Sequence, residues 1–363
     1  MENKSTQLTE EDLAEAVVDE LGVVYSPDGK RLLRVPRWGI KLGNVTSYTV
    51  KPGTQHICDE AFSDCNSLKS IILPDSLTSI GDLTFLNCEF EDISIPDSVT
   101  HIGEKAFLQC KSLVSISIPN GVTGIGDLAF MQCSSLTSIA IASSVTRIGG
   151  GAFRACRSLK EVIIPDGVTR ISDCAFVDCE SLESISIPDS VTRIGCGAFE
   201  GCGSLKEIII PEGVAIIGDC AFDGCSSLER ITIPDSVIRI GDSTFMNCSS
   251  LTSIVISDCV TSINANTFNG CGSLKDITIP DGVTSLGEYA FAGCDSLEDI
   301  SIPEGVTFIG DYAFEGCKSL KSISIPDSVK FVGDSAFAGC NSLTDDMKAE
   351  IISRFGTGCM RCE

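Results

Sequence analysis

The sequence is poor in the side chains that most often carry catalysis. Its 363 residues include only two histidines, one tryptophan and four tyrosines. His56 and His101 have no serine or cysteine motif beside them, and neither a P-loop nor a G-x-G-x-x-G motif after a strand is present. Because these constellations are missing, we expect no enzymatic activity, no catalytic residue and no cofactor.

Basic residues are scarce relative to acidic ones. Lysine and arginine number 26 against 50 aspartates and glutamates, which gives a net charge of −24. A chain this acidic repels nucleic-acid phosphates and anionic lipid. No stretch reaches about 18 consecutive apolar residues, so we expect no membrane-spanning helix. The expected partners are therefore proteins, with no nucleic acid and no membrane insertion, and we expect the chain to be a monomer.

The first residues contain no apolar segment of the kind found in secretory signal peptides. The chain begins Met-Glu-Asn-Lys-Ser-Thr-Gln-Leu and carries 20 cysteines in total. Both features favour a reducing, cytoplasmic location. The alternative is a cell-surface or secreted protein that is exported by a signal-independent route.

An internal repeat is the dominant feature that is present. The unit reads roughly S-L-x-x-I-x-I-P-D-S-V-T-x-I-G-D-x-A-F-x-x-C, and its copies are 23 residues apart except for one 22-residue step between Cys88 and Cys110. One cysteine, which we call the ladder cysteine, ends each unit. The ladder cysteines are Cys65, Cys88, Cys110, Cys133, Cys156, Cys179, Cys202, Cys225, Cys248, Cys271, Cys294, Cys317 and Cys340.

Each unit has too few apolar positions to bury a face alone, so neighbouring units must share one core. In the unit from Leu182 to Cys202, Ile185 and Ile187 alternate with serines, which predicts a strand with one face inward. V-T-x-I predicts a second, narrower ladder, and A-F-x-x-C predicts a short helical turn. Gly195 marks a position that we expect to need a positive φ.

The predicted fold is an α/β repeat solenoid: a right-handed, leucine-rich-repeat-type stack of coils with a parallel sheet on one face, short helical turns and capped ends. We expect a cap over residues 1–44, with a helix at 9–21 and a hairpin at 23–36. Residues 45–343 form a solenoid of 13 coils. Residues 344–363 supply a capping helix, at 345–355 with Thr344 as N-cap and Gly356 as its end, and a loose tail.

The repeat resembles the BspA-type leucine-rich repeat, which occurs in bacterial surface proteins and some protozoan parasites. The resemblance covers residues 45–343, and the segments Val24–Pro36 and Ala349–Gly356 look like end segments of such proteins in gut bacteria. It implies a curved solenoid that binds proteins, often in adhesion to host matrix or to other cells. The family has no shared catalytic residues to carry over.

The ladder cysteines and two acidic columns each have a structural and a functional interpretation. We expect the ladder cysteines to be buried thiols, since parallel stacked side chains suit neither disulfides nor metal sites. Cys174, Cys196 and Cys220 are expected to be partly exposed and more reactive, and Cys359-x-x-Cys362 is expected to bind no metal. The aspartates that follow proline and those that precede A-F fit turns and N-caps, although stacked carboxylates are also ligands for calcium.

Candidate residues for partner binding are few. An arginine column occupies the x position of V-T-x-I: Arg147, Arg170, Arg193 and Arg239, interrupted by Ile216. Arg230 is the one residue of a hot-spot type at an outward position of the wide sheet. Trp38 lies in a basic segment and either anchors a partner or closes the cap. The arginines either dock an acidic partner or pair with neighbouring carboxylates.

Two functions follow from these observations. The first is a non-catalytic protein–protein interaction solenoid in adhesion or host interaction, as the resemblance implies. The second is an intracellular scaffold or regulatory binding protein, which the cysteine content and the N-terminal sequence favour.

Overall fold

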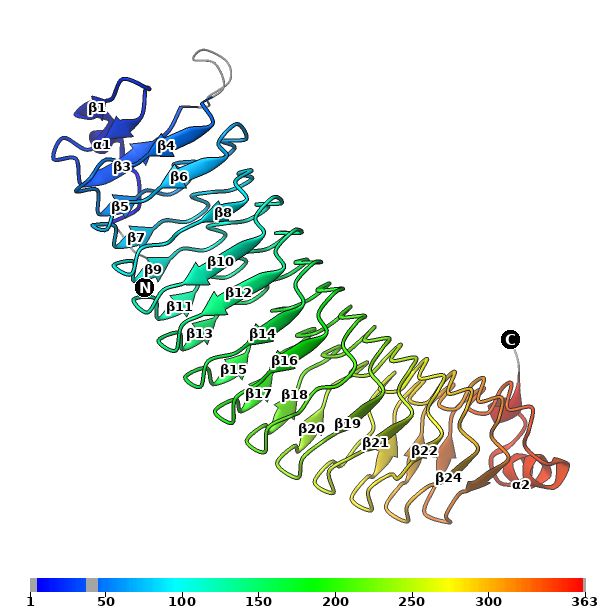
Figure 1. Ribbon diagram of the computed structural model, residues 1–363. Helices are drawn as coiled ribbons and strands as arrows, with labels where there is room; N and C mark the ends of the chain where they lie inside the picture. Colours follow the sequence, from blue (N-terminus) through cyan, green and yellow to red (C-terminus); the bar gives the residue numbers. More distant parts are fainter. Residues whose placement is uncertain (1–4, 37–44, 362–363) are drawn as a thin grey trace. The chain divides into compact units, whose positions relative to one another are not determined.

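The computed structural model describes residues 5–36 and 45–361, and the chain divides into two compact units, Met1–Pro188 (unit 1) and Asp189–Glu363 (unit 2). Each unit is a stack of β-solenoid coils built from short parallel strands, with little helix (Figure 1). Together the units hold about 13 coils, as the repeat predicted. Trp38 and Cys362 lie outside the described residues.

The described residues of unit 1 form one helix and sixteen strands. They are α1 (Glu10–Ala14), β1 (Val17–Val18), β2 (Val24–Tyr25), β3 (Arg31–Arg34), β4 (Ser47–Thr49), β5 (His56–Ile57), β6 (Ser70–Ile72), β7 (Ser79–Ile80), β8 (Asp92–Ile93), β9 (His101–Ile102), β10 (Ser115–Ile118), β11 (Gly124–Ile125), β12 (Ser138–Ile141), β13 (Arg147–Ile148), β14 (Glu161–Ile163), β15 (Arg170–Ile171) and β16 (Ser184–Ser186).

Unit 2 contains eleven strands, one α-helix and one 3₁₀ helix among its described residues. They are β17 (Arg193–Ile194), β18 (Ile216–Ile217), β19 (Arg230–Thr232), β20 (Arg239–Ile240), β21 (Ser253–Val255), β22 (Asp276–Ile277), β23 (Ser285–Leu286), β24 (Asp299–Ser301), β25 (Phe308–Ile309), β26 (Ser322–Ser324), β27 (Phe331–Val332), α2 (Asp345–Phe355) and η1 (Gly358–Met360).

Two parallel ladders run through each unit, one from each extended piece of the repeat. In unit 1 the wide sheet has the order β16-β14-β12-β10-β8, and the narrow ladder includes β5-β7-β9-β11-β13. The register is one repeat, so Ser115 pairs with Ser138 and Ile116 with Ile139. Equivalent side chains therefore form columns: the serines are exposed, while the isoleucines face inward, with Ile116 buried and Ile139 half-buried. Strands β10, β12, β14 and β16 lie side by side in Figure 1.

Columns of phenylalanine and leucine fill the core of each unit. In unit 1 the rings of Phe107 and Phe130 stack with centroids 5.1 Å apart, and in unit 2 those of Phe222 and Phe245 are 5.5 Å apart. These side chains are fully buried. A buried aromatic ring in every coil gives the core a large apolar area in spite of the low aromatic content of the chain.

The predicted helical turn at A-F-x-x-C is wrong, because these segments form no helix. They are non-helical turns with two left-handed residues in each coil, such as Glu60 and Asp64 with φ of 57° and 60°. The alternation of backbone handedness turns amide groups toward the next coil. The Glu60 N–H donates to Asp82 O at 2.8 Å and the Phe62 N–H to Thr84 O at 2.9 Å. The turns thus form a third hydrogen-bonded ladder.

The prediction that Gly195 and its counterparts need a positive φ is also wrong, since the first positive φ of the turn occurs two residues later, as at Gly197. The reason for glycine here is close packing against the preceding coil. A Cβ on Gly218 would lie 2.6 Å from Cys196 N and 2.7 Å from Gly195 C. Asn264 occupies the equivalent position in a later coil, and its side chain bonds to the preceding coil: Asn264 Nδ2 donates to Ile240 O at 2.7 Å.

The N-terminal cap differs from the predicted helix at 9–21. Only Glu10–Ala14 is helical, and the chain then enters β1, which pairs with β2 of the hairpin β2–β3. The helix is short because none of its residues is buried, so no tertiary contact extends it. The hairpin falls within the predicted residues 23–36 and closes the stack by pairing β3 in parallel with β5.

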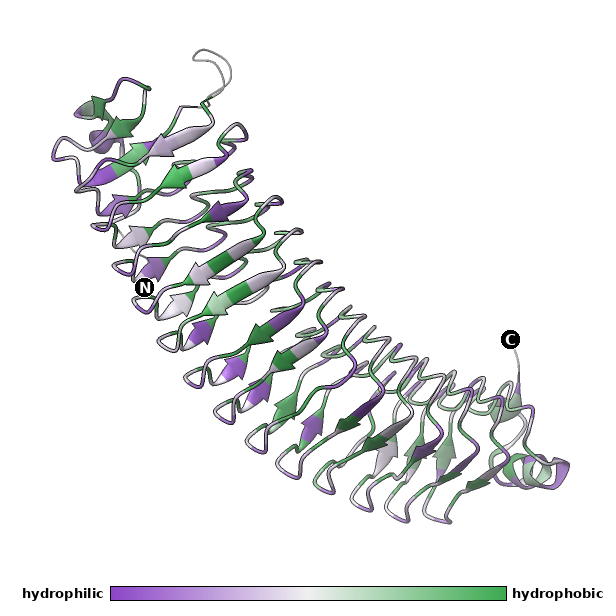
Figure 2. Ribbon diagram, viewed as in Figure 1, coloured by the Kyte–Doolittle hydropathy of each residue, from purple (hydrophilic) through white to green (hydrophobic). Residues whose placement is uncertain are grey.

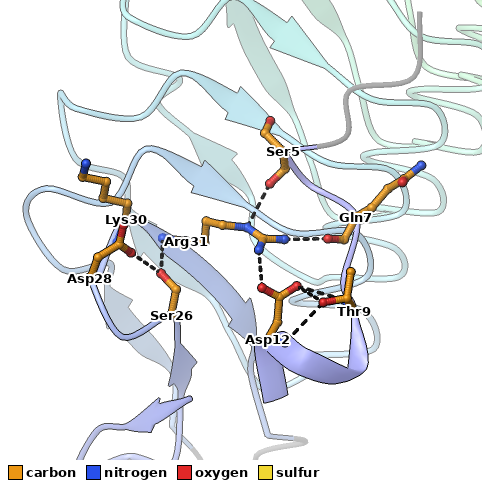
Figure 3. Close-up of polar contacts among 8 residues, drawn as sticks. All are labelled: Ser5, Gln7, Thr9, Asp12, Ser26, Asp28, Lys30 and Arg31. Carbon is orange, nitrogen blue, oxygen red and sulfur yellow. Dashed lines mark hydrogen bonds and ion pairs between the residues drawn. The ribbon is translucent and has the colours of Figure 1, made fainter. Parts of the chain in front are cut away.

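Arg31 ties the N-terminal segment to this hairpin (Figure 3). Its guanidinium donates to Ser5 O at 3.0 Å and to Gln7 O at 2.5 Å, and it forms an ion pair with Asp12 at 2.5 Å. Asp12 and Thr9 form a reciprocal capping box at the start of α1. Although burial acts in the opposite direction, these hydrogen bonds and the charge of Arg31 lower the pKa of Asp12.

At the other end, α2 coincides with the predicted helix at 345–355, and Thr344 Oγ1 accepts from Met347 N at 3.2 Å. The predicted loose tail is wrong for Gly358–Met360, which form η1. The Ser335 N–H donates to Gly358 O at 2.9 Å and the Phe337 N–H to Cys359 O at 2.8 Å. The tail is ordered because it occupies the place of the next turn in the third ladder.

Candidate binding surfaces

The arginine column in unit 1 consists of Arg147 and Arg170 at the outward positions of β13 and β15. Both are exposed, while Ile148 and Ile171 beside them point into the core. Figure 2 shows this as purple and green residues on the same short strands. The guanidinium of Arg147 is 2.7 Å from the carboxylate of Asp127, and about half of each side chain is exposed. An exposed pair of this kind contributes about 1 kcal/mol or less to stability.

Unit 2 places Arg193, Ile216 and Arg239 in one column. The three residues are in direct parallel register on β17, β18 and β20, and both arginines are exposed. Because strands are about 4.8 Å apart, the two guanidinium stems are about 10 Å apart. Arg239 is 4.0 Å from Asp219. Pairing with a neighbouring carboxylate, one of the two predicted roles, therefore holds for Arg147 and Arg239.

Arg230 lies on β19 of the wide sheet and is exposed, with Ser253 as its register partner. The sheet face around it has few large side chains. Exposed isoleucines and valines occur singly at outward positions, such as Ile163 in unit 1 and Ile209 in unit 2. Trp38, the remaining candidate, lies outside the described residues.

The aspartates before A-F are bound to the neighbouring coil. Asp59 Oδ1 accepts from Asp82 N at 2.9 Å, and Asp219 Oδ1 accepts from Asp242 N at 3.1 Å. The carboxylate thus caps the turn of the next coil, whereas the sequence predicted an N-cap within its own coil. In residues 5–36 and 45–361 no group of three or more histidine, cysteine or acidic side chains is arranged to hold a metal ion.

The ladder cysteines are buried and form no disulfide. Most of them also donate a hydrogen bond that the sequence did not predict, from the thiol to the phenylalanine carbonyl of the preceding coil, as from Cys271 Sγ to Phe245 O at 3.1 Å. Burial raises the pKa of the Cys156 and Cys271 thiols to about 12. These donors are Cys88, Cys110, Cys133, Cys156 and Cys179 in unit 1, and Cys225, Cys248, Cys271, Cys294, Cys317 and Cys340 in unit 2.

Cys174, Cys196 and Cys220 are half-buried, as predicted from their places off the ladder. For Cys220, however, burial and then the charge of Asp223 raise the pKa, which makes its thiol less reactive. Within residues 5–36 and 45–361 the most exposed cysteine is Cys259, which was not predicted from the sequence. Its place in S-D-C-V, where most coils have serine or glycine in a surface turn, was the available signal.

The histidines form no accessible catalytic pair. His56 Nδ1 lies 2.7 Å from Ser79 Oγ, but Ser79 is only 2% exposed, so its hydroxyl cannot reach a substrate. Burial lowers the pKa of His56 and of His101. The contact joins neighbouring strands β5 and β7 of the narrow ladder and is explained by packing.

A surface that the sequence analysis missed lies in unit 2. Phe308 and Phe331 occupy the outward positions of β25 and β27, and 42% and 50% of these residues are exposed. The signal was a phenylalanine at the x position of V-T-x-I, where earlier coils carry arginine, serine, histidine, glycine or isoleucine.

The family model for the BspA type leucine rich repeat region matches residues 41–160, 123–252 and 215–344. The chain belongs to this family. A comparison with curated protein sequences found no match. Membership of the BspA-type family is therefore supported by the match of the repeat to the family model and by similarity to solved structures.

Two solved structures resemble this BspA-type chain at 31% identity. One is a leucine-rich repeat protein from Bacteroides ovatus, with a TM-score of 0.78, covering 99% of this chain and 91% of that one. The other is a leucine rich cell surface protein from Faecalibacterium prausnitzii, with a TM-score of 0.56 and coverage of 94% and 97%. A leucine-rich repeat protein from Eubacterium ventriosum, 24% identical with a TM-score of 0.58, shares the fold. Among the described residues no helix is long and apolar enough to cross a membrane.

Proposed function

We propose that this chain is a non-catalytic, protein-binding solenoid that acts in adhesion or host interaction at the cell surface. The observation that carries the proposal is the in-register column of outward-facing side chains that each unit presents, such as the exposed Arg193 and Arg239 on either side of the half-buried Ile216 in unit 2. Such columns give a partner repeated contacts of one chemistry. Support for the location comes from the similar Faecalibacterium prausnitzii protein, which is described as a cell surface protein.

The alternative is an intracellular scaffold. The buried ladder thiols favour it, because they carry no disulfide and fit a reducing compartment. Both alternatives share protein binding and differ in location.

Location is tested by protease treatment of intact producing cells, followed by detection of the chain in surface, medium and cytosolic fractions. Loss of the full-length chain from treated cells, or its presence in the medium, supports the surface proposal. Protection of the entire pool in the cytosol contradicts it and leaves the intracellular scaffold.

The arginine column is tested with a fluorescent poly-glutamate peptide as an acidic probe. Exposed charge pairs contribute about 0.2–1 kcal/mol each, so the double variant Arg193→Gln/Arg239→Gln should weaken binding about fivefold. The matched control is Lys318→Gln/Lys321→Gln, which removes two exposed cations already paired with Asp295 and Glu298. Equal effects of the two double variants would show that net charge, and not the column, holds the probe.

A further inference from the structure

Two stacked aromatic pairs occur in successive coils of unit 2. The rings of Phe308 and Phe331 have centroids 5.1 Å apart and an interplanar angle of 6°, and those of Tyr289 and Tyr312 are 4.6 Å apart at 3°. Phe308 and Tyr312 belong to the same coil, four residues apart. We call these four residues, with Asp311 and Asp334, the aromatic–acidic patch.

The fold does not require aromatic residues at these places. Ser285 is the register partner of Phe308 on β23, so the same ladder position accepts a small polar side chain. The position of Tyr312 is serine at Ser335, one coil later. Because 42% of Phe308 and 50% of Phe331 are exposed, a large part of each residue stays open to solvent and can contact a partner. Solvent-exposed aromatic residues gathered in one place are typical of binding surfaces.

The charge around the rings is strongly negative. Residues 281–340 include ten aspartates and glutamates but only three lysines. Lys318 and Lys321 are paired with acidic residues at 2.9 Å and 2.5 Å. Lys330 donates to Asp327 O at 2.7 Å. Asp311 and Asp334 each follow, by three residues, the phenylalanine of their own coil and are exposed. A cation that approaches a ring face here also enters the field of these carboxylates.

We propose that the aromatic–acidic patch binds an extended, arginine-rich segment of a protein partner. This inference rests on the proposed protein-binding function and adds the chemistry of one partner. An arginine guanidinium stacks on aromatic faces and also donates to carboxylates, so it matches both parts of the patch. An extended segment places alternate side chains on one face, so that several arginines of the partner can face the patch together.

Charge complementarity selects this occupant over others. A second copy of this chain carries the same net charge of −24 and is repelled. Nucleic acid and anionic lipid surfaces are repelled for the same reason. A neutral apolar segment would use the rings but would leave the carboxylates Asp311 and Asp334 without a cationic partner.

The test uses the full chain and a fluorescein-labelled peptide of alternating arginine and alanine, with the change in fluorescence anisotropy giving Kd. We expect Phe308→Ala/Phe331→Ala to weaken binding about tenfold, which corresponds to about 1.4 kcal/mol. The matched control, Ile72→Ala/Ile163→Ala in unit 1, removes two exposed aliphatic side chains and should leave Kd unchanged. Any binding of a peptide of alternating glutamate and alanine should be unchanged by Phe308→Ala/Phe331→Ala.

Two further variants separate the parts of the mechanism. Phe308→Leu/Phe331→Leu keeps apolar bulk but loses the aromatic faces, so it should lose about as much affinity as the alanine variant. Retained affinity would overturn the stacking of arginine on the rings. Asp311→Asn/Asp334→Asn removes both charges but keeps a side-chain oxygen that can accept a hydrogen bond from a backbone N–H, as Asp311 Oδ1 does from Asp334 N. This variant should weaken binding of the arginine peptide and reduce the dependence of Kd on salt.

The possible failures remain distinguishable. If the wild-type chain binds the arginine peptide but neither the phenylalanine nor the aspartate variant changes Kd, the patch is wrong while protein binding stands. If the wild-type chain does not bind the arginine peptide, the inference fails. The broader function is then judged on cell location and on the arginine-column variants.

Discussion

The ladder thiols should be almost inert in the folded protein, and this can be tested quantitatively. Only the thiolate reacts with a maleimide or a disulfide reagent. At pH 8 a thiol with the ordinary pKa of 9.0 is about one-tenth ionised, whereas Cys271, with a pKa of about 12, is about one ten-thousandth ionised. The pKa alone therefore slows its reaction about a thousandfold. Full burial of the sulfur slows it further.

The perturbation is denaturation, and the assay is thiol labelling followed by mass spectrometry of peptides. Among the cysteines that the structure describes, Cys259 should react first in the native protein because it is exposed, and Cys174, Cys196 and Cys220 should follow. In guanidinium chloride the thirteen ladder cysteines should all react at ordinary rates. The variant Cys259→Ser should remove the fastest native labelling phase among the described cysteines. The number of ladder cysteines that are labelled after denaturation should stay the same.

Two results would refute the reasoning. Rapid native labelling of the thirteen ladder cysteines would mean that the column is open to solvent. Absence of ladder thiols after denaturation would mean that they are held in disulfides or otherwise modified, in conflict with their hydrogen bonds to phenylalanine carbonyls such as Phe245 O.

Three other predictions concern stability. In a denaturant titration, Gly218→Ala should destabilise the chain by about 1–3 kcal/mol, because the new Cβ meets the backbone of the preceding coil. The control Gly272→Ala, whose new Cβ has nothing within 4 Å, should cost less than about 1 kcal/mol. Equal effects of the two variants would contradict the close-packing explanation. Cys271→Val should cost about 1 kcal/mol in the same titration through loss of the thiol donor, and a neutral result would show that the column acts by packing alone. Because the pKa of Asp12 is lowered in the folded chain, its contribution to stability is present above the ordinary value of 3.8 and is lost as the pH falls through the lower folded value. Arg31→Met should shrink this acid-dependent part of the unfolding free energy, and an unchanged pH profile would refute the role of the ion pair.

The architecture follows from the amino-acid pattern alone. A 23-residue period with one apolar set in each unit leaves no way to bury the isoleucines except by stacking coils. The same alternation specified both ladders, and helix α2 with its cap at Thr344 could be read from local signals, since an N-cap acts within one turn. The outward places of Arg147, Arg170, Arg193 and Arg239 followed from the register, because a parallel stack carries each position into a column.

The contacts that hold one coil to the next become visible only when the coils are stacked. Gly218 is explained by the backbone of the preceding coil, Asp59 by an amide in the next one, and Cys271 by a carbonyl 26 residues earlier. Each of these residues also has a plausible role within its own coil, so the pattern of a single repeat could not distinguish the two. The helical turn predicted at A-F-x-x-C was wrong for the same reason. The left-handed residues of these turns are stabilised by hydrogen bonds between coils, and those bonds form only when the coils are stacked.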